Sequence, residues 1–242
     1  MDGVISPRVE GTPQGSPLSP LLSNILLDEL DKELEKRGHR FCRYADDCNI
    51  YVGSKRAGER VLERITEFLK KKLHLKVNQE KSGVNRPWKS KYLGYSMTSE
   101  RSPRLKPSEK NVQRFKERIR EQTRVGKGWN MDLLIKKLTQ KIRGWGNYFK
   151  LADVKMVFED LDSWIRRRLR RNIWKQWKKP NIRRRQLMNL GISKEMASKT
   201  AYNGSGPWVN SGKQAMNIAF PKKYFEAHGL VSLLNMRLSR KV

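Results

Sequence analysis

The sequence predicts an α+β protein in which a small sheet with packed helices precedes a helical domain. Three observations predict this class: short alternating apolar stretches near residues 40–52, apolar residues at helical spacing on both sides of them, and a strongly basic helical stretch farther along. We expect a sheet-and-helix domain over residues 1–100, a helical domain over 101–180 and a small basic extension over 181–242.

The first expected helix follows a loop that is rich in proline and glycine. Gly11 and Gly15 let the backbone approach a ligand closely, and Pro13 stiffens the loop. Ser19 is a good N-cap and Pro20 a suitable first helical residue. One helix face is expected in the core because apolar residues recur at helical spacing, namely Leu18, Leu21, Leu22, Ile25, Leu26, Leu30 and Leu34. The loop suits the binding of a nucleotide or template base, or is an ordinary loop before a capped helix.

Two adjacent carboxylates separate the alternating stretches. Residues 40–44 and 48–52 alternate as half-buried strands do, which places Asp46 and Asp47 at the tip of a β-hairpin. Hard cations such as Mg²⁺ prefer carboxylate oxygens and bind through one or two of them. The pair is either an ordinary turn or a Mg²⁺ site for phosphoryl chemistry, and the preceding loop favours the metal site.

The elements that follow the hairpin are predicted from apolar spacing. Residues 61–73 form a second amphipathic helix that packs under the sheet, and Leu75 and Val77 alternate as a further strand. The two cysteines that flank the aspartates, Cys42 and Cys48, are expected to be reduced core residues. The sequence contains no Cys-x-x-Cys pair and only three scattered histidines, which argues against a structural zinc site.

A proline-containing linker near residues 101–107 precedes three expected helices, at about 108–124, 131–150 and 153–177. The third helix has an apolar stripe and, opposite it, six basic residues: Arg166, Arg167, Arg168, Arg170, Arg171 and Lys175. These residues form a solvated face, a membrane-binding face or a nucleic-acid interface. Arginine suits bidentate phosphate contacts and stacking on bases, so we favour nucleic acid, as double-stranded RNA or RNA–DNA hybrid.

The charge of the chain supports a polyanionic partner. The formal net charge is +29, from 53 basic and 24 acidic residues. Residues 1–100 carry +4, residues 101–185 carry +19 and residues 186–242 carry +6, so the middle segment is the expected electrostatic grip. No uninterrupted apolar run approaches the roughly 18 residues of a membrane span and no signal peptide opens the chain, so we expect a cytoplasmic protein with no membrane partner.

In this order and at this spacing, the motifs resemble the palm of a reverse transcriptase, and more narrowly the group II intron reverse transcriptase/maturase family. Residues 11–24 and 41–52 resemble the family's fourth and fifth sequence blocks, 75–82 its sixth and 92–95 its seventh. The Gly-Trp-Gly-Asn-Tyr-Phe stretch that ends at Phe149 and the Arg/Trp-rich stretch 164–177 resemble domain X, the maturase and thumb region. Ser16 departs from the pattern, since many relatives carry a second glycine there.

The resemblance implies roles for individual residues. Asp46 and Asp47 would be catalytic and would bind Mg²⁺. Nucleotide or template contacts would come from Pro13, Gln14, Gly15, Tyr44, Ala45 and Lys81. Tyr92, Leu93 and Gly94 would form the primer grip, and the six basic residues of the third helix would bind nucleic acid. For Lys81 a merely solvated side chain, and for Tyr92 and Leu93 a place in the strand core, are the alternatives.

The implied fold is a partial right-hand polymerase palm followed by an α-helical thumb/maturase domain and a C-terminal, DNA-binding extension. The family's first palm aspartate and fingers precede the loop at Gly11, and we find no counterpart of them, so we expect an N-terminally truncated chain that is inactive as a polymerase alone. We expect an RNA-directed DNA polymerase/maturase that uses intron RNA, an RNA template, a DNA primer and an N-terminal half in trans. The alternatives are a non-enzymatic intron RNA-binding maturase and a helix–turn–helix regulator, which leaves the aspartate pair unexplained.

Overall fold

A computed structural model describes residues 17–238 and divides the chain into two compact units, Met1–Tyr92 and Leu93–Val242. Helices dominate both units, and each unit has one two-stranded antiparallel sheet in its described part. The mixed class expected from the sequence is therefore confirmed. None of the helices in the described part of the chain is long and apolar enough to cross a bilayer.

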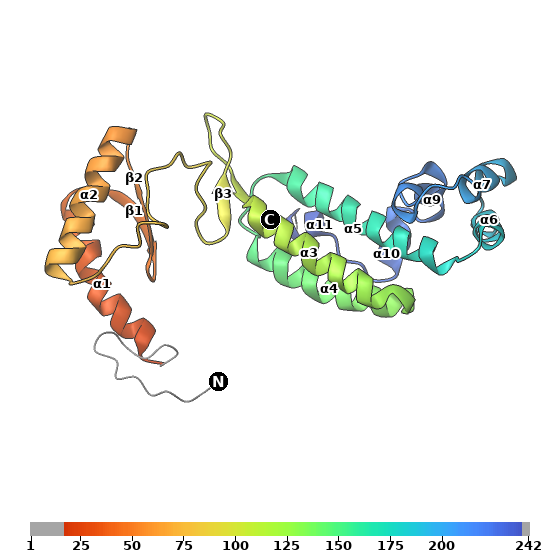
Figure 1. Ribbon diagram of the computed structural model, residues 1–242, viewed down its shortest axis with the longest axis horizontal. Helices are drawn as coiled ribbons and strands as arrows, with labels where there is room; N and C mark the ends of the chain where they lie inside the picture. Colours follow the sequence, from red (N-terminus) through yellow and green to blue (C-terminus); the bar gives the residue numbers. More distant parts are fainter. Residues whose placement is uncertain (1–16, 239–242) are drawn as a thin grey trace. The chain divides into compact units, whose positions relative to one another are not determined.

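From residue 17 onward, the first unit contains two helices and a β-hairpin (Figure 1). Its elements are α1 (Ser19–Lys36), β1 (Arg40–Tyr44), β2 (Asp47–Tyr51) and α2 (Lys55–Lys72). Ser54 begins α2 as an N-cap, because its side chain accepts a hydrogen bond from the Ala57 amide at 3.2 Å. The core of this unit contains Leu27, Leu30, Leu34 and Ile65, with Phe41, Ile50 and Phe68 packed against them.

Only the second half of α1 is buried, which corrects the expectation that its whole apolar face is core. The apolar side chains of the first half are 42–62% exposed, namely Leu18, Leu21, Leu22, Ile25 and Leu26. Within residues 17–92, the hairpin and α2 cover only the last turns of α1. Helical spacing identified the apolar face, but it carries no information on how much of that face finds a partner. The helix also begins at Ser19, with Leu18 at the N-cap position, so Ser19 is not the N-cap.

The strand expected at Leu75 and Val77 is not formed. After α2 the chain turns at His74, whose φ is 53°, and the Leu75 amide donates to the Leu69 carbonyl at 2.9 Å. This contact returns the chain to the end of α2. A strand exists only where a neighbouring strand accepts its hydrogen bonds, and among the described residues the hairpin pairs only with itself.

The second unit opens with a short sheet and continues into three long helices. Its first elements are β3 (Tyr95–Met97), β4 (Leu105–Pro107), α3 (Glu109–Val125), the short 3₁₀ helix η1 (Gly126–Gly128), α4 (Met131–Tyr148) and α5 (Lys155–Gln176). The three long helices agree with the sequence prediction. The expected linker instead forms the turn and second strand of a hairpin. In Figure 1, α3, α4 and α5 lie side by side.

Side-chain contacts join α3 to α5 at several points along both helices. Lys116 and Arg120 of α3 lie over the indole ring of Trp164 at 5.9 and 5.6 Å. Farther along, the Asn172 amide of α5 donates to the Thr123 carbonyl at 2.8 Å. All three contacts join residues that are 44–49 positions apart, and they progress in the same direction along both helices, so the two helices run parallel.

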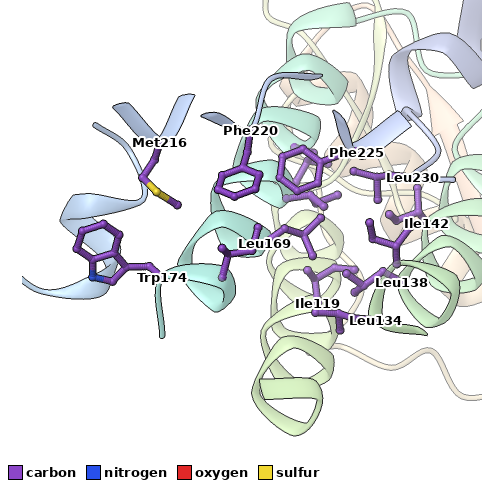
Figure 2. Close-up of a cluster of buried hydrophobic side chains, with 14 of the residues drawn as sticks. Ile119, Leu134, Leu138, Ile142, Leu169, Trp174, Met216, Phe220, Phe225 and Leu230 are labelled. Carbon is purple, nitrogen blue, oxygen red and sulfur yellow. The ribbon is translucent and has the colours of Figure 1, made fainter. Parts of the chain in front are cut away.

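Six short helices follow α5 in the described part of the second unit, and five of them contribute residues to its hydrophobic core. They are α6 (Pro180–Asn189), α7 (Lys194–Ala201), α8 (Pro207–Asn210), α9 (Gln214–Ala219), α10 (Lys222–Ala227) and α11 (Leu233–Leu238). Helices α6 and α7 are joined by a tight turn in which Gly191 has a φ of 82°, and the Ser193 side chain caps α7. Figure 2 shows Met216, Phe220 and Phe225 in the cluster that also contains Leu169 and Ile119.

A buried aspartate attaches α11 to α5. Asp162 is 6% exposed, and its carboxylate accepts hydrogen bonds from the Ser232 hydroxyl at 2.6 Å and from the amides of Leu233 and Leu234 at 2.9 and 3.2 Å. These amides begin α11 and have no carbonyl partner in their own helix. Asp162 therefore acts as the N-cap of a helix about 70 residues away.

Replacing Asp162 with Ala should destabilise the protein by about 2–4 kcal/mol, because a buried amide, a partly buried amide and a hydroxyl would lose their acceptor. Thermal unfolding followed by circular dichroism measures the effect. The matched control is Asp160→Ala, on the exposed side of the same helix, which should change stability by less than about 0.5 kcal/mol. Equal melting temperatures for the two variants would show that the cap contributes nothing.

Candidate functional site

The hairpin of the first unit presents the two aspartates to solvent. Tyr44 pairs with Asp47, so Ala45 and Asp46 form a two-residue turn. Ala45 has a φ of 53°, the left-handed conformation that such turns require and that a residue with a Cβ adopts at a cost. Asp46 and Asp47 are both exposed, as the hairpin prediction requires.

The donor set of the hairpin fits a hard divalent cation. Asp46 and Asp47 supply carboxylate oxygens, and Mg²⁺ usually keeps several water ligands beside one or two carboxylates. Among residues 17–238 no cluster of three or more His, Cys, Asp or Glu side chains is arranged to hold a metal ion. Within the described residues, the hairpin therefore presents two carboxylates and no third ligand.

The cysteines beside the turn are free thiols. Cys48 is half-buried, and burial, together with the charge of Asp31, raises the pKa of its thiol to about 11. Cys42 is exposed, so the expectation of a core residue is wrong for Cys42. A neutral thiol at Cys48 adds no charge to the carboxylate pair.

The other residues expected at the nucleotide site are distributed along the chain. Pro13, Gln14 and Gly15 lie outside the described residues. Tyr44 is 65% exposed next to the turn, and Lys81 is an exposed residue in a turn that Asn78 stabilises. Their side chains are accessible to a ligand.

The turn at Leu93 and Gly94 is held by two of the long helices of the second unit. Both residues have positive φ, 49° and 79°. The Tyr148 hydroxyl of α4 donates to the Leu93 carbonyl at 2.9 Å, and the side-chain amide of Asn111 on α3 donates to the Gly94 carbonyl at 3.1 Å. The Ser108 amide donates to the same Gly94 carbonyl at 2.9 Å. Tyr148 belongs to the Gly-Trp-Gly-Asn-Tyr-Phe stretch, which thus has a defined structural task.

Replacing Gly94 with Ala should destabilise the protein by about 2–3 kcal/mol, since a left-handed conformation costs a residue with a Cβ roughly 1–2 kcal/mol. The new Cβ would also lie 2.8 Å from the Asn111 side-chain nitrogen. Urea unfolding measures the loss. Gly144→Ala is the matched control, because that helical position has open space and should gain about 0.5–1 kcal/mol. An unchanged free energy of unfolding in Gly94→Ala would show that this position does not require glycine.

A basic groove of about 790 Å³ runs between α3 and α5. Eight of its twelve lining residues are basic: Arg114, Arg118, Arg120, Arg124, Lys127, Arg168, Arg171 and Lys175. Only two of the lining residues are acidic, Glu117 and Glu121, so the net charge of the groove lining is strongly positive. Burial, and after it the repulsion from Arg171, Lys127 and Arg168, lowers the pKa of Lys175, because both disfavour its charged form. A polyanion in the groove would relieve this repulsion.

The six basic residues expected on the third helix do not share one face. Arg171 and Lys175 line the groove. Arg168 also lines it, but donates to the Thr123 hydroxyl at 2.6 Å, and burial with the charges of Arg171 and Arg120 lowers its pKa to about 10. Arg166 is half-buried.

The remaining two arginines contact the C-terminal helices. Arg167 stacks on the ring of Trp208 at 4.2 Å and donates to the Trp208 carbonyl. Arg170 is 8% exposed, donates to the Phe220 carbonyl at 3.0 Å and lies 5.7 Å from the Phe225 ring. The expectation that all six point outward is therefore wrong for Arg170, because the short helices that cover it were not predicted to pack on α5.

The sequence prediction missed the groove side that α3 supplies. Its basic residues are Arg114, Arg118, Arg120 and Arg124, with Lys127 just beyond. The signal was the charge excess of residues 101–185, which includes α3 as well as α5. Only the parallel packing of the two helices brings both rows of charge together.

Two segments of the chain match known protein families. Residues 3–97 match the family model "Reverse transcriptase (RNA-dependent DNA polymerase)" and residues 112–191 match "Group II intron, maturase-specific domain". The chain is also similar to Protein YkfC of Escherichia coli (strain K12), with 29% identity over 116 residues, 34% of this chain and 30% of that protein. The aligned part thus spans under a third of the relative's length. The two matched models, in this order along one chain, show that it belongs to the group II intron reverse transcriptase/maturase family.

Proposed function

We propose that this chain takes part in RNA-directed DNA synthesis by a group II intron reverse transcriptase/maturase. In this proposal the first unit is the C-terminal part of a polymerase palm, and α3, α4 and α5 form the thumb/maturase domain. The observation that carries it is the hairpin, which presents Asp46 and Asp47 to solvent within the segment that matches the reverse transcriptase model.

Asp46 is proposed to bind Mg²⁺ directly, with Asp47 as the supporting carboxylate. When bound, Mg²⁺ would stabilise charge on the phosphoryl oxygens and orient the reacting groups. The hairpin limits the freedom of both side chains, because the turn between paired strands fixes their backbone. A fixed position is what ligands of a catalytic ion require.

Other residues are proposed to position the substrates. Tyr92, Leu93 and Gly94 would contact the primer end, and the bonds from Tyr148 and Asn111 would keep the Leu93–Gly94 backbone in place. Contacts to the nucleotide or template would come from Pro13, Gln14, Gly15, Tyr44, Ala45 and Lys81.

The groove between α3 and α5 is proposed to bind the backbone of RNA or of an RNA–DNA hybrid. Its arginines provide planar donors that match phosphate, and their charge releases condensed counterions on binding. Among the six residues of the third helix, Arg171, Lys175 and Arg168 would contribute to this site. Arg166 lies outside it, near Lys222 and Glu226 of α10. Arg167 and Arg170 would support the helix that carries them.

Primer extension tests the proposal. The chain is mixed with a polypeptide that carries the family's fingers and first palm carboxylate, an RNA template with an annealed DNA primer, deoxynucleotides and Mg²⁺. We expect DNA product that disappears when EDTA replaces Mg²⁺ or when this chain is omitted. Equal product without the chain would contradict the proposal.

A second function, intron RNA binding without DNA synthesis, is favoured by one observation. The groove residues 114–175 all fall within the segment 112–191 that matches the maturase-specific domain. In that case the chain would accelerate splicing of a group II intron RNA in vitro, and Asp46→Asn would splice as well as the unaltered chain.

A further inference from the structure

We propose that Arg43 is a positioning residue that fixes the aspartate turn against α1. The proposal rests on the metal-binding role of the hairpin proposed above. Arg43 lies on β1, one residue before Tyr44, and its side chain is only 11% exposed although its neighbours in the turn are exposed. An arginine buried to this degree in a small unit requires partners for its charge and its donors.

The guanidinium of Arg43 has three different partners. It donates to both carboxylate oxygens of Asp31 on α1, from Nε at 2.7 Å and from Nη2 at 2.5 Å. Its Nη1 donates to the side-chain oxygen of Asn24, also on α1, at 3.1 Å and to the Ala45 carbonyl at 3.0 Å. Arg43 thus joins two turns of one helix to the backbone of the hairpin tip.

The hydrogen bond to the Ala45 carbonyl restrains the backbone of the next residue, Asp46, which is the proposed metal ligand. The Ala45 carbonyl belongs to the peptide bond that leads into Asp46, and a peptide bond is planar, so fixing its oxygen fixes the direction of the Asp46 amide. Ala45 is itself in a left-handed conformation that a residue with a Cβ seldom adopts. A turn of this kind persists when its surroundings determine it.

Asp31 balances the positive charge of Arg43. An unpaired arginine beside Asp46 and Asp47 would compete with a cation for their negative charge. The bidentate pair with Asp31 neutralises Arg43 locally, and its hydrogen bond raises the pKa of the guanidinium. Arg43 can therefore orient the turn while the two exposed carboxylates keep their charge for a metal ion.

A lysine at position 43 would separate the charge pairing with Asp31 from the orientation of the turn. The Arg43→Lys variant keeps the positive charge and can pair with Asp31, but an ammonium has no planar fork to reach Asp31, Asn24 and Ala45 together. We expect the fold to survive and the turn to lose its fixed orientation.

The experiment is a Mn²⁺ titration of the ¹⁵N-labelled chain followed by NMR, in which a bound paramagnetic ion broadens nearby amide signals. In the unaltered chain the signals of residues 44–48 should broaden first, and Asp46→Asn should remove this effect. Arg43→Lys should raise the Mn²⁺ concentration for half-broadening by about threefold or more, since losing one charge-assisted hydrogen bond changes a binding equilibrium by at least that factor. Arg40→Lys, on an exposed position of the same strand, is the matched control and should not change it.

The outcomes separate the two proposals. If the unaltered chain shows no broadening that depends on Asp46, the metal site is wrong and the role of Arg43 falls with it. If Asp46→Asn removes the broadening but Arg43→Lys titrates as the unaltered chain does, only the role of Arg43 is wrong. Should Arg43→Lys fail to fold, Asp31→Asn, which retains an acceptor for Arg43, should weaken Mn²⁺ binding in the same direction, and an unchanged titration would overturn the inference.

Discussion

Replacing four basic residues of the groove with glutamine is expected to weaken RNA binding by about tenfold or more and to flatten its salt dependence. The variant changes Arg114 and Arg118 on α3 together with Arg171 and Lys175 on α5. Each phosphate contact that is lost should reduce the slope of log affinity against log salt by about 0.7–0.9. If all four residues contact phosphates, the slope falls by about 3.

Fluorescence anisotropy with a labelled structured RNA at several salt concentrations measures this slope. The matched control replaces four exposed basic residues of α4, Lys136, Lys137, Lys141 and Arg143, with glutamine. It removes the same charge from the same unit but not from the groove. Equal slopes for the two variants would show that the chain binds RNA through its overall charge and not through the groove.

Arg170 must stay unaltered in this experiment. Its guanidinium is buried and donates to the Phe220 carbonyl, so Arg170→Gln would remove a partner of that carbonyl and leave an amide under the C-terminal helices. A loss of binding in such a variant would report on folding. The structure therefore separates the arginines that support α5 from those that are free to meet a ligand.

The sequence predicted those parts of the fold that depend on local periodicity. The three long helices, α3 to α5, end within a few residues of their expected bounds, because each has an apolar stripe long enough to identify it. The hairpin was predicted for a similar reason, since alternating stretches on both sides of Asp46 and Asp47 leave room only for a tight turn.

What the sequence could not predict depends on contacts between distant segments. Leu21 and Ile25 have the right spacing for a core face but are exposed, since the described part of the first unit offers them no partner. Leu75 and Val77 alternate as a strand does, yet no neighbouring strand pairs with them. Arg170 is of a residue type that is usually exposed, yet it is buried against Phe220, 50 positions farther along the chain, and against Phe225.

Two residues with positioning contacts were also missed, although each left a signal. Arg43 stands at an inward position of an alternating strand, where an arginine requires a buried acceptor, and Asp31 lies on the preceding helix. Tyr148 lies at the end of α4 in a motif that resembles domain X but had no role assigned to its individual residues, and only the folded structure brings its hydroxyl to the Leu93 carbonyl.

Replacing Asp46 with Asn should reduce DNA synthesis by on the order of a thousandfold, because losing several kcal/mol of metal-dependent stabilisation corresponds to that factor. Asparagine keeps the size of the side chain but removes its charge. The groove is unaltered, so the affinity for primer–template should stay the same, and the loss should appear in the rate of the chemical step.

Asp28→Asn is the matched control for this change. Asp28 is a surface carboxylate of α1, 54% exposed and paired with Lys32, and it belongs to the same unit as Asp46. Its removal should leave the rate of DNA synthesis unaltered, because a surface ion pair contributes little.

The most direct measurement is the rate at which one deoxynucleotide is added to an RNA-templated primer in a single turnover, with the family's fingers and first palm carboxylate supplied as a second polypeptide. We predict Mg²⁺-dependent incorporation by the unaltered chain and by Asp28→Asn, and none above background by Asp46→Asn at saturating primer–template. Incorporation by Asp46→Asn at the rate of the unaltered chain would contradict the assignment of the hairpin as the catalytic centre.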